Sequence, residues 1–564
     1  MEMTGAEAIL ASLKEEQVPV VFGYPGGAVL GLYDAIYQTG FPHILTGHEQ
    51  GAIHAADGYA RATGKVGVCI ATSGPGVCNM VTGIATANMD SIPLVIISGQ
   101  VATSLIGQDA FQEADTAGIT TPITKYNYLV RKAENLPQVL KEAFYIARTG
   151  RPGPVLIDIV TDVFDAKLDF QYPKEVHLLG YQGSQHPRQA DVQRAAEALR
   201  RARRPVIMAG GGVILSDTGR ELTHLAEKTG IPVVTTLMGK GAVPDTLAQH
   251  LGMLGMHGSY AANMAVSGCD LLLAFGVRFD ERSTAKASLF APAARIVHFN
   301  VEPGEINKII PVQVAVPGDL RESLPLFSQL VDPLAEEFRE QVAPWREQAE
   351  AMKAEVPCAA HACAGGISPE TALKQAAARA PRDTIVVTDV GQHQMWAAQF
   401  FPTLEARHFI TSGGLGTMGF GLPAALGAKV GEPDKTVLLI TGDGSILMNC
   451  QEFTTLPTYG IQVKTIVLKN GQLGMVRQLQ GLFRGGRYSQ TKLIRKPSMA
   501  KIAEAMGIPS RSISCPEELE EGLDFLFGTE DSALLEITIP EDERVYPVVP
   551  GSKGLDQMIL GRED

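Results

Sequence analysis

Two polar turns in the last third of the chain carry residue types that suit a metal-bound phosphate. Asp443 stands between Gly442 and Gly444 directly after an apolar run, and Asn470 follows the next strongly apolar run. Parallel strands end at the same edge of a sheet, so Asp443, Asn470 and the main-chain carbonyl of Gln472 are expected to converge there. Such hard oxygen ligands suit Mg²⁺, and the two glycines would let the main chain approach a phosphate. An isolated Gly-Asp-Gly turn is common, and it is the spacing to Asn470 that favours a site.

The elements that would position these turns form a regular alternation. Short runs rich in β-branched residues alternate with amphipathic helical stretches and end in glycine turns, a pattern typical of parallel βαβ units. We therefore predict an α/β protein of three consecutive doubly wound parallel-sheet domains, residues 1–171, 188–331 and 367–564, with 332–366 as a linker. The strands are expected at Val66–Ala71, Leu94–Ser98, Val155–Ile159, Val206–Ala209, Val233–Thr235, Leu271–Phe275, Ile296–Phe299, Ile385–Thr388, Val437–Thr441 and Thr465–Leu468.

The composition excludes several classes of protein. The chain has 564 residues, of which 45% are apolar and 19% charged, enough to build several buried cores. Its 48 basic and 61 acidic residues give a net charge of −13, so neither nucleic acid nor an anionic membrane is an expected partner. Because the apolar runs are only as long as strands and no leader pattern is visible, we expect a cytoplasmic protein. The cysteines, including Cys358 and Cys363 in the linker, are expected to be reduced thiols.

Further motifs extend over nearly the whole chain. They are FGYPGG from Phe22, HEQGAIHAADGYARATGKVGV from His48, SGPG from Ser73, SGQVATSLIGQDAFQEAD from Ser98, RTGRPGPVLID from Arg148, LGMLGMHG from Leu251, GVRFDER from Gly276, GQHQMW from Gly391 and SGGLGTMGFGLPAALGAK from Ser412. Together with the Gly-Asp-Gly and Asn470 turns, they resemble the catalytic large subunits of the acetohydroxyacid synthase (acetolactate synthase) family, which depend on thiamine diphosphate. The resemblance implies a pyrimidine-binding first domain, an FAD-type central domain and a diphosphate-binding third domain.

This resemblance implies a cofactor site for thiamine diphosphate and Mg²⁺. Glu49 would bond the pyrimidine ring and promote loss of the thiazolium proton, a task for a positioned carboxylate. A lone glutamate at the start of a helix is usually structural, and the surrounding match is what gives Glu49 this role. Asp443, Asn470 and Gln472 would hold the metal. The residues implied for thiamine diphosphate are Gln392, His393, Gly416, Met418, Gly442, Gly444, Ser445 and Met475.

The central domain would bind FAD as a structural cofactor. Three glycines follow its first strand, but the GxGxxG pattern is absent, so this signal alone is weak. The resemblance implies FAD contacts from Gly210, Gly211, Gly212, Met256, His257, Arg278, Asp280 and Asp319.

Substrate-binding residues are also implied by the resemblance. Arg282 would grip the carboxylate of the second substrate, as suits a planar guanidinium, although Arg282 and Asp280 could equally form a surface ion pair. Gln112 would lie beside the reacting centre, with Phe111, Val476 and Leu479 in the substrate pocket. The family joins its first and third domains across a subunit interface, which implies a homodimer at least, with a tetramer and a small regulatory subunit as further partners.

The sequence departs from the family pattern at four positions. Lys469 replaces the first asparagine of the thiamine motif, and Thr161 replaces a lysine after the last strand of the first domain. Glu281 replaces an aspartate of the FAD motif, and Leu479 replaces a tryptophan that packs against the acceptor ketoacid. These changes concern substrate choice and flavin fit more than the thiamine site.

The resemblance implies an acetolactate synthase, which decarboxylates pyruvate and transfers the two-carbon unit to pyruvate or 2-ketobutyrate, the first common step of branched-chain amino-acid biosynthesis. Another thiamine diphosphate-dependent carboligase or 2-ketoacid decarboxylase on the same scaffold is the nearest alternative. A flavin or nicotinamide oxidoreductase is an alternative of another class, but it leaves the pairing of Asp443 with Asn470 unexplained. A non-catalytic paralogue that serves as an assembly partner is a third alternative.

Overall fold

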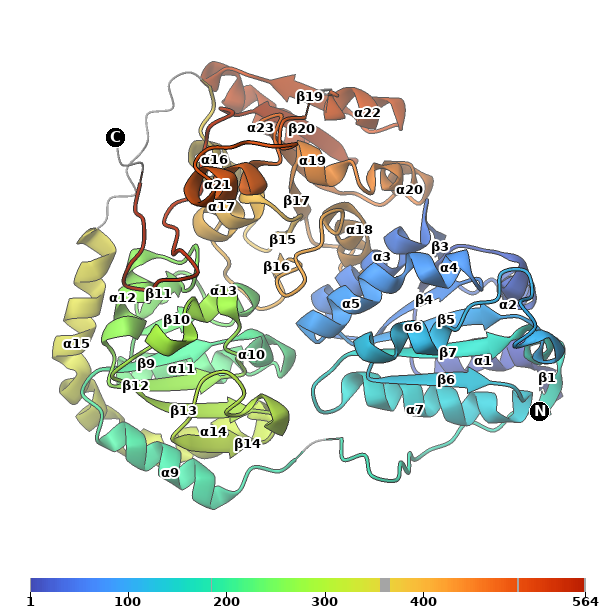
Figure 1. Ribbon diagram of the computed structural model, residues 1–564, viewed down its shortest axis with the longest axis horizontal. Coiled ribbons are helices and arrows are strands. Elements are labelled where there is room, and N and C mark those ends of the chain that lie inside the picture. Colours follow the sequence, from blue (N-terminus) through green and yellow to red (C-terminus); the bar gives the residue numbers. More distant parts are fainter. Residues whose placement is uncertain (1, 184, 356–365, 494–496, 562–564) are drawn as a thin grey trace.

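Three parallel sheets of six strands, each flanked by helices, form the protein (Figure 1). The computed structural model describes residues 2–183, 185–355, 366–493 and 497–561. The predicted fold class is confirmed, and each predicted strand is present within one or two residues of its expected bounds. Central strands such as β5 and β7 are buried along their whole length, which explains their continuous apolar sequences.

The first sheet has the strand order β3-β2-β4-β5-β7-β6. Its strands are β2 (Val21–Gly23), β3 (His43–Leu45), β4 (Gly67–Ala71), β5 (Leu94–Gln100), β6 (Tyr126–Val130) and β7 (Pro154–Val160). Its helices are α1 (Gly5–Glu15), α2 (Leu30–Thr39), α3 (Glu49–Thr63), α4 (Pro75–Asn79), α5 (Val81–Asp90), α6 (Thr116–Thr120), α7 (Leu136–Arg148) and α8 (Thr161–Asp165). A small antiparallel pair, β1 (Glu2–Thr4) with β8 (Lys167–Asp169), closes this domain.

The middle sheet has the order β11-β10-β9-β12-β13-β14. Its strands are β9 (Pro205–Ala209), β10 (Val233–Thr235), β11 (His250–Met253), β12 (Leu271–Phe275), β13 (Arg295–Asn300) and β14 (Val314–Pro317). Its helices are α9 (Gln189–Arg200), α10 (Gly211–Leu215), α11 (Gly219–Thr229), α12 (Tyr260–Gly268), α13 (Glu281–Thr284) and α14 (Leu320–Val331). This order is that of dinucleotide-binding folds, whose ligands lie where the order reverses, here between β9 and β12.

The third sheet has the order β16-β15-β17-β18-β20-β19, the same topology as the first. Its strands are β15 (Ile385–Thr388), β16 (Phe409–Ile410), β17 (Val437–Gly442), β18 (Lys464–Lys469), β19 (Ser510–Ile513) and β20 (Ala533–Thr538). Its helices are α16 (Pro369–Arg379), α17 (Gln392–Phe400), α18 (Gly421–Gly431), α19 (Asp443–Ile446), α20 (Thr455–Thr458), α21 (Gly474–Phe483), α22 (Met499–Ala505) and α23 (Leu519–Gly528).

The segment expected to be a linker contains a long helix, α15 (Ala335–Glu355). This helix lies along the outer side of the middle domain (Figure 1), and its buried Trp345 donates a hydrogen bond to the carbonyl of Pro205 at 3.1 Å. Residues 356–365, with Cys358 and Cys363, lie outside the described residues. Across the described ranges, no helix has both the length and the apolar character needed to cross a membrane.

Helices α3 and α18 join the first domain to the third. Their backbones approach so closely that a Cβ on Gly58 would lie 2.0 Å from the carbonyl oxygen of Ala424, and one on Gly427 would lie 1.8 Å from that of Ala55. A side chain at either glycine would therefore push the two helices apart.

Candidate active site

A cavity of about 60 Å³ opens at the carboxyl ends of β15, β17 and β18. It lies where the strand order of the third sheet reverses, between β15 and β17, the usual ligand position in open α/β sheets. The cavity is lined by Val390, Gly391, Gln392, His393, Trp396, Met418, Gly442, Asp443, Gly444, Ser445, Leu468, Asn470, Gln472, Leu473, Gly474, Met475 and Val476. Most residues that the sequence assigned to thiamine diphosphate and metal are thus brought together. Gly416 is not in this lining, but its left-handed φ of 70° shapes the loop that carries Met418.

Asp443 is the acidic group of this cavity. It begins α19 and is 3% exposed, and its Oδ2 accepts a hydrogen bond from the Gly471 amide at 2.9 Å. Burial raises the pKa of Asp443 to about 6, because a carboxylate loses its hydration there. Among the described residues, no basic side chain forms an ion pair with it. A buried carboxylate of this kind fits a divalent cation.

Asn470 and Gln392 lie side by side next to Asp443. The Asn470 amide nitrogen donates to Oε1 of Gln392 at 3.2 Å, and Asn470 Oδ1 accepts from the Gln472 amide at 3.0 Å. A Cβ at Gly474 would lie 1.9 Å from Gln392 Oε1, so a side chain there would displace the Gln392 amide. These amide and main-chain oxygens supply neutral ligands of the type that Mg²⁺ accepts beside one carboxylate.

His393 offers a buried polar atom to the same cavity. Its Nε2 is buried without a hydrogen-bond partner in the described part of the chain. Burial lowers the pKa of His393 to about 3, so the ring is neutral at physiological pH. A Cβ on Gly442 would lie 2.8 Å from His393 Nδ1, so Gly442 permits the close approach. Buried polar atoms are normally satisfied, and an acceptor or donor on a bound group would complete this one.

Lys469 does not point at the cavity. Its ammonium forms an ion pair with Glu536 on β20 at 3.0 Å, and it is not among the residues that line the cavity. Glu536 is 1% exposed, so the pair is largely buried, and the Lys469 charge opposes the rise in the pKa of Asp443 from a distance. This departure from the family pattern therefore belongs to the packing of β18 against β20.

Glu49 lies in a second, separate group of residues in the first domain. It begins α3, is buried, and accepts a hydrogen bond from the Asn79 amide at 3.0 Å. Gln112 lies nearby in the loop that packs on Gly74 of the SGPG turn, and the adjacent Phe111 is 88% exposed. Glu49, Gln112 and Phe111 are absent from the lining of the Asp443 cavity. In the single chain these three residues therefore form a group apart from the Asp443 cavity.

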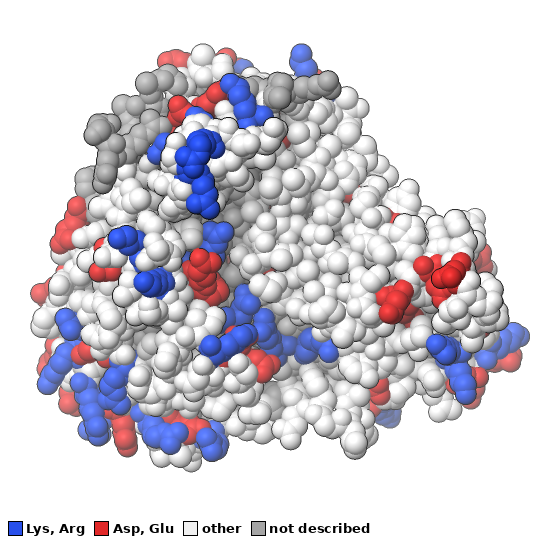
Figure 2. Space-filling view, in the orientation of Figure 1, with Lys and Arg blue, Asp and Glu red and all other residues white. Residues whose placement is uncertain are grey.

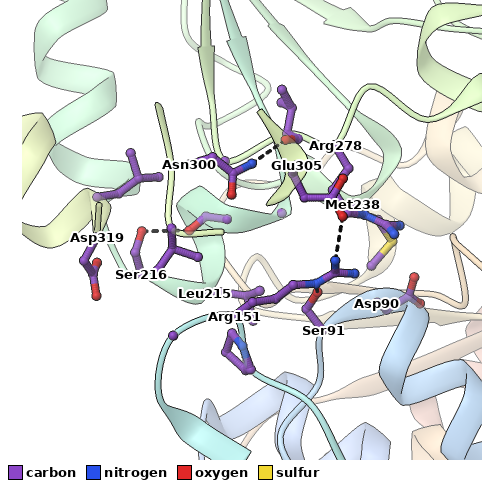
Figure 3. A pocket seen from close by; sticks show the side chains of 18 of the residues that line it. Asp90, Ser91, Arg151, Leu215, Ser216, Met238, Arg278, Asn300, Glu305 and Asp319 are labelled. Atoms are coloured by element: carbon purple, nitrogen blue, oxygen red, sulfur yellow. Dashed lines mark hydrogen bonds and ion pairs between the residues drawn. The ribbon is translucent and has the colours of Figure 1, made fainter. Parts of the chain in front are cut away.

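A larger cavity of about 260 Å³ lies between the first and middle domains (Figure 3). It contains Gly211, Gly212, Arg278, Asp280 and Asp319 of the residues assigned to FAD. The cavity sits at the reversal of strand order between β9 and β12, and its guanidinium and carboxylate groups suit the diphosphate and hydroxyl groups of a dinucleotide. Gly210 lies just before this lining, at the start of α10.

The structure does not place Met256 and His257 on this cavity. The Met256 amide donates to the Arg282 carbonyl at 2.8 Å, and His257 Nδ1 lies 3.1 Å from the carbonyl oxygen of Pro547. Asp280 accepts from the Ser283 amide at 3.1 Å and so caps α13. Arg282 is exposed and its guanidinium lies 3.1 Å from the sulfur of Met256. The alternative of an Asp280–Arg282 ion pair is therefore not what the structure shows.

Two substrate-pocket assignments differ in position. Val476 lines the Asp443 cavity, whereas Leu479 lies one turn further along α21, half-buried and outside that lining. Sequence reasoning missed Asn79, which orients Glu49, and Asp90 and Ser91, which line the larger cavity. Asn79 follows the SGPG turn by three residues, and this proximity to the motif is the sequence signal that could have indicated it.

Comparisons with known proteins agree along the whole chain. Residues 3–119 match the thiamine pyrophosphate enzyme N-terminal TPP binding domain, residues 192–326 its central domain and residues 389–537 its C-terminal TPP binding domain. The chain is 44% identical to the acetolactate synthase large subunit of Haemophilus influenzae, covering 100% of this chain and 99% of that protein. It is 46% identical to the acetolactate synthase large subunit of Corynebacterium glutamicum, covering 99% and 91%. It is 44% identical to the acetolactate synthase isozyme 3 large subunit of Escherichia coli, covering 100% of both chains.

Proposed function

This chain belongs to the acetolactate synthase large-subunit family of thiamine pyrophosphate enzymes, and from that premise we propose that it decarboxylates pyruvate and transfers the two-carbon unit to a second 2-ketoacid. The acceptor is pyruvate or 2-ketobutyrate. The observation that carries the proposal is the cavity beside β17, where a buried carboxylate that forms no ion pair among the described residues meets amide oxygens and a glycine-bordered turn.

In this proposal, Asp443, Asn470 and the main chain of Gln472 would hold Mg²⁺, and the ion would supply positive charge for the cofactor diphosphate. Gln392, His393, Gly442, Gly444 and Ser445 surround that diphosphate, and Gly416, Met418 and Met475 position the rings. Thiamine diphosphate, when bound, supplies the electron sink that decarboxylation of a 2-ketoacid requires. The protein supplies binding, orientation and exclusion of water.

Glu49 is the proton-handling group in this proposal. Its Oε2 is oriented by Asn79 at 3.0 Å, and its other oxygen remains for the pyrimidine ring. Gln112 and Phe111 border the same region of the first domain, and Arg282 binds the carboxylate of the second ketoacid. Val476 and Leu479 form the wall of the acceptor pocket from α21.

Because Glu49 lies in a group of residues apart from the Asp443 cavity, we propose that two copies of the chain complete each active site. The surface near α4 and α5 of the first domain and α19 and α20 of the third is almost without charged side chains (Figure 2). It includes the exposed apolar residues Met89, Leu415, Leu447 and Met448. Depletion of charge is typical of the core of an interface. A tetramer and a small regulatory subunit extend the same proposal, since the relatives are named large subunits.

The larger cavity takes FAD as a structural cofactor in this proposal. The dinucleotide-type strand order, Arg278 and Asp319 support it. Met256 and His257 do not form walls of this cavity. They would support FAD binding indirectly, through the segment that packs on the carboxyl-terminal part of the third domain.

Product analysis with pyruvate alone tests the proposed reaction. We expect acetolactate to form only when both thiamine diphosphate and Mg²⁺ are present. Acetaldehyde without acetolactate would instead identify a 2-ketoacid decarboxylase. Turnover that persists without thiamine diphosphate would favour an oxidoreductase that uses the middle domain.

A further inference from the structure

Helix α5 ends at the larger cavity and contacts a loop that borders the smaller one. Its last residue, Asp90, and the following Ser91 line the larger cavity (Figure 3). Residues of the same helix also contact the loop 411–418 of the third domain. That loop carries Gly416 and Met418, and Met418 lines the smaller cavity. One helix therefore contacts the proposed dinucleotide site and the loop of the proposed thiamine site.

The contacts between α5 and the loop are short and buried. Asp90 accepts hydrogen bonds from the amides of Gly414 at 2.7 Å and Gly413 at 3.2 Å. One turn earlier, the hydroxyls of Thr86 and Thr417 lie 2.7 Å apart. Hydrogen bonds to an ionised group are among the stronger ones in proteins. The position of Asp90 consequently sets the position of the loop.

A buried cation holds Asp90 in place. Arg61 on α3 donates to Asp90 at 2.9 Å, to the Thr411 carbonyl at 2.8 Å and to Asp57. Arg61 therefore ties α3, α5 and the start of the loop into one network. Because Asp90 is held on several sides, a displacement of the end of α5 would move the loop with it.

At the larger cavity, the end of α5 contacts arginine side chains that a bound ligand would also contact. Ser91 accepts from Arg151 at 2.9 Å, and Arg151 also pairs with Glu305 at 2.8 Å (Figure 3). Arg278 reaches toward Gly414, with its Nη2 3.2 Å from where a Cβ on that glycine would lie. Burial, together with the nearby charge of Arg278, lowers the pKa of Arg151. An anionic diphosphate in this cavity would offset the repulsion between the two guanidinium groups and draw them to itself.

We propose that a dinucleotide in the larger cavity and thiamine diphosphate in the smaller one bind cooperatively, because Asp90 and Ser91 at the end of α5 position the loop 413–418. Asp90 is a positioning residue in this scheme, since it acts on the cofactor through the loop. The inference rests on the proposed cofactors. Coupling between two binding sites is reciprocal, so each ligand must raise the affinity of the other by the same factor.

Calorimetric titration of cofactor-free protein tests the coupling directly. Thiamine diphosphate with Mg²⁺ is titrated with and without saturating FAD, and FAD is titrated with and without thiamine diphosphate and Mg²⁺. We expect each dissociation constant to fall by the same factor of at least about fivefold, the lower end of typical coupling between sites. A change below twofold, or unequal factors in the two directions, overturns the inference.

A matched pair of serine variants locates the coupling. Ser91→Ala removes one acceptor of Arg151, whereas Ser216→Ala alters the same cavity at a hydroxyl whose hydrogen bonds within the described part of the chain are to Gly212, Val213 and Thr218. We expect Ser91→Ala to reduce the coupling factor at least twofold while both cofactors still bind, and Ser216→Ala to leave it unchanged. Equal coupling in the two variants overturns the role of the helix end.

A second variant and a product assay keep the outcomes separate. Asp90→Asn retains an acceptor for Gly414 but removes the charge that faces Arg61, and it should also reduce the coupling factor. It is included only if its unfolding temperature shows that the variant is folded. If it is not folded, Ser91→Ala alone decides the test. Acetolactate formation from pyruvate is measured on the wild-type preparation. Acetolactate formation without coupling overturns this inference alone, whereas thiamine diphosphate binding without acetolactate formation overturns the proposed reaction alone.

Discussion

Replacing Lys469 with methionine is expected to destabilise the third domain and to spare the cofactor site. The Lys469 ammonium is paired with Glu536 at 3.0 Å, and both side chains are largely buried, 16% and 2% exposed. Methionine keeps the stem of the side chain but leaves Glu536 without its cation. Removing one partner of a buried ion pair costs roughly 3–5 kcal/mol.

The remaining contacts of Glu536 set the magnitude at the low end of that range. Its carboxylate keeps the Met499 amide and the hydroxyls of Ser498 and Ser512, the last at 3.0 Å. We therefore expect a loss of roughly 3 kcal/mol of unfolding free energy. For a domain of this size, roughly 2–4 °C per kcal/mol gives a fall of about 6–12 °C in its unfolding temperature.

Differential scanning calorimetry of the wild type and three variants measures this effect. Lys469→Met should show the fall, and adding Glu536→Gln should recover at least a third of it, because a neutral amide needs no counter-charge. The exposed Lys501→Met serves as the control and should shift the transition by less than about 2 °C. The dissociation constant of thiamine diphosphate should stay within threefold in every variant.

Two results would refute this reasoning. If the unfolding temperature of Lys469→Met changes no more than that of Lys501→Met, the buried pair does not stabilise the fold. If instead cofactor affinity falls while stability is kept, Lys469 faces the diphosphate, and the departure from the family pattern bears on chemistry.

Four further variants probe the site and the core. Glu49→Gln should bind thiamine diphosphate in calorimetry yet lose carboligation by far more than tenfold, and activity within tenfold of wild type, about 1.4 kcal/mol of barrier, contradicts its role. Asp443→Ala should weaken Mg²⁺-dependent cofactor binding at least tenfold, and an unchanged affinity means that the metal lies elsewhere. Burial lowers the pKa of His54 to about 3, so below about pH 6.5 the unfolded chain takes up a proton that the folded chain does not, and stability falls as the pH falls. His54→Leu should raise the unfolding temperature, more at pH 5 than at pH 8, since both ring nitrogens are buried without partners in the described chain; an equal effect at both pH values argues against this. Leu479→Trp should shift products from mixed ketoacids toward the 2-ketobutyrate adduct by threefold or more, and a wild type that already prefers 2-ketobutyrate more than tenfold excludes Leu479 as the determinant.

The sequence by itself determined the sheets and the convergence of Asp443 with Asn470. Buried parallel strands such as Leu271–Phe275 are continuous apolar runs whose bounds follow from local composition. The proximity of Asp443 and Asn470 could be predicted from the sequence, because adjacent parallel strands end at the same edge of a sheet whatever packs around them. Short-range pattern and strand direction were sufficient for these features.

Only the tertiary structure decided what depends on contacts between distant segments. The direction of Lys469 is set by Glu536, which lies 67 residues away in sequence on a neighbouring strand. The close packing of α3 on α18 brings Gly58 and Gly427 against Ala424 and Ala55, which lie far away in the sequence. The position of Asp90, at the larger cavity and against Gly413, Gly414 and Arg61, needs three elements to meet. Such side-chain directions result from burial and charge pairing in the folded core. The local periodicity of a single sequence does not identify the distant residue that each side chain will contact.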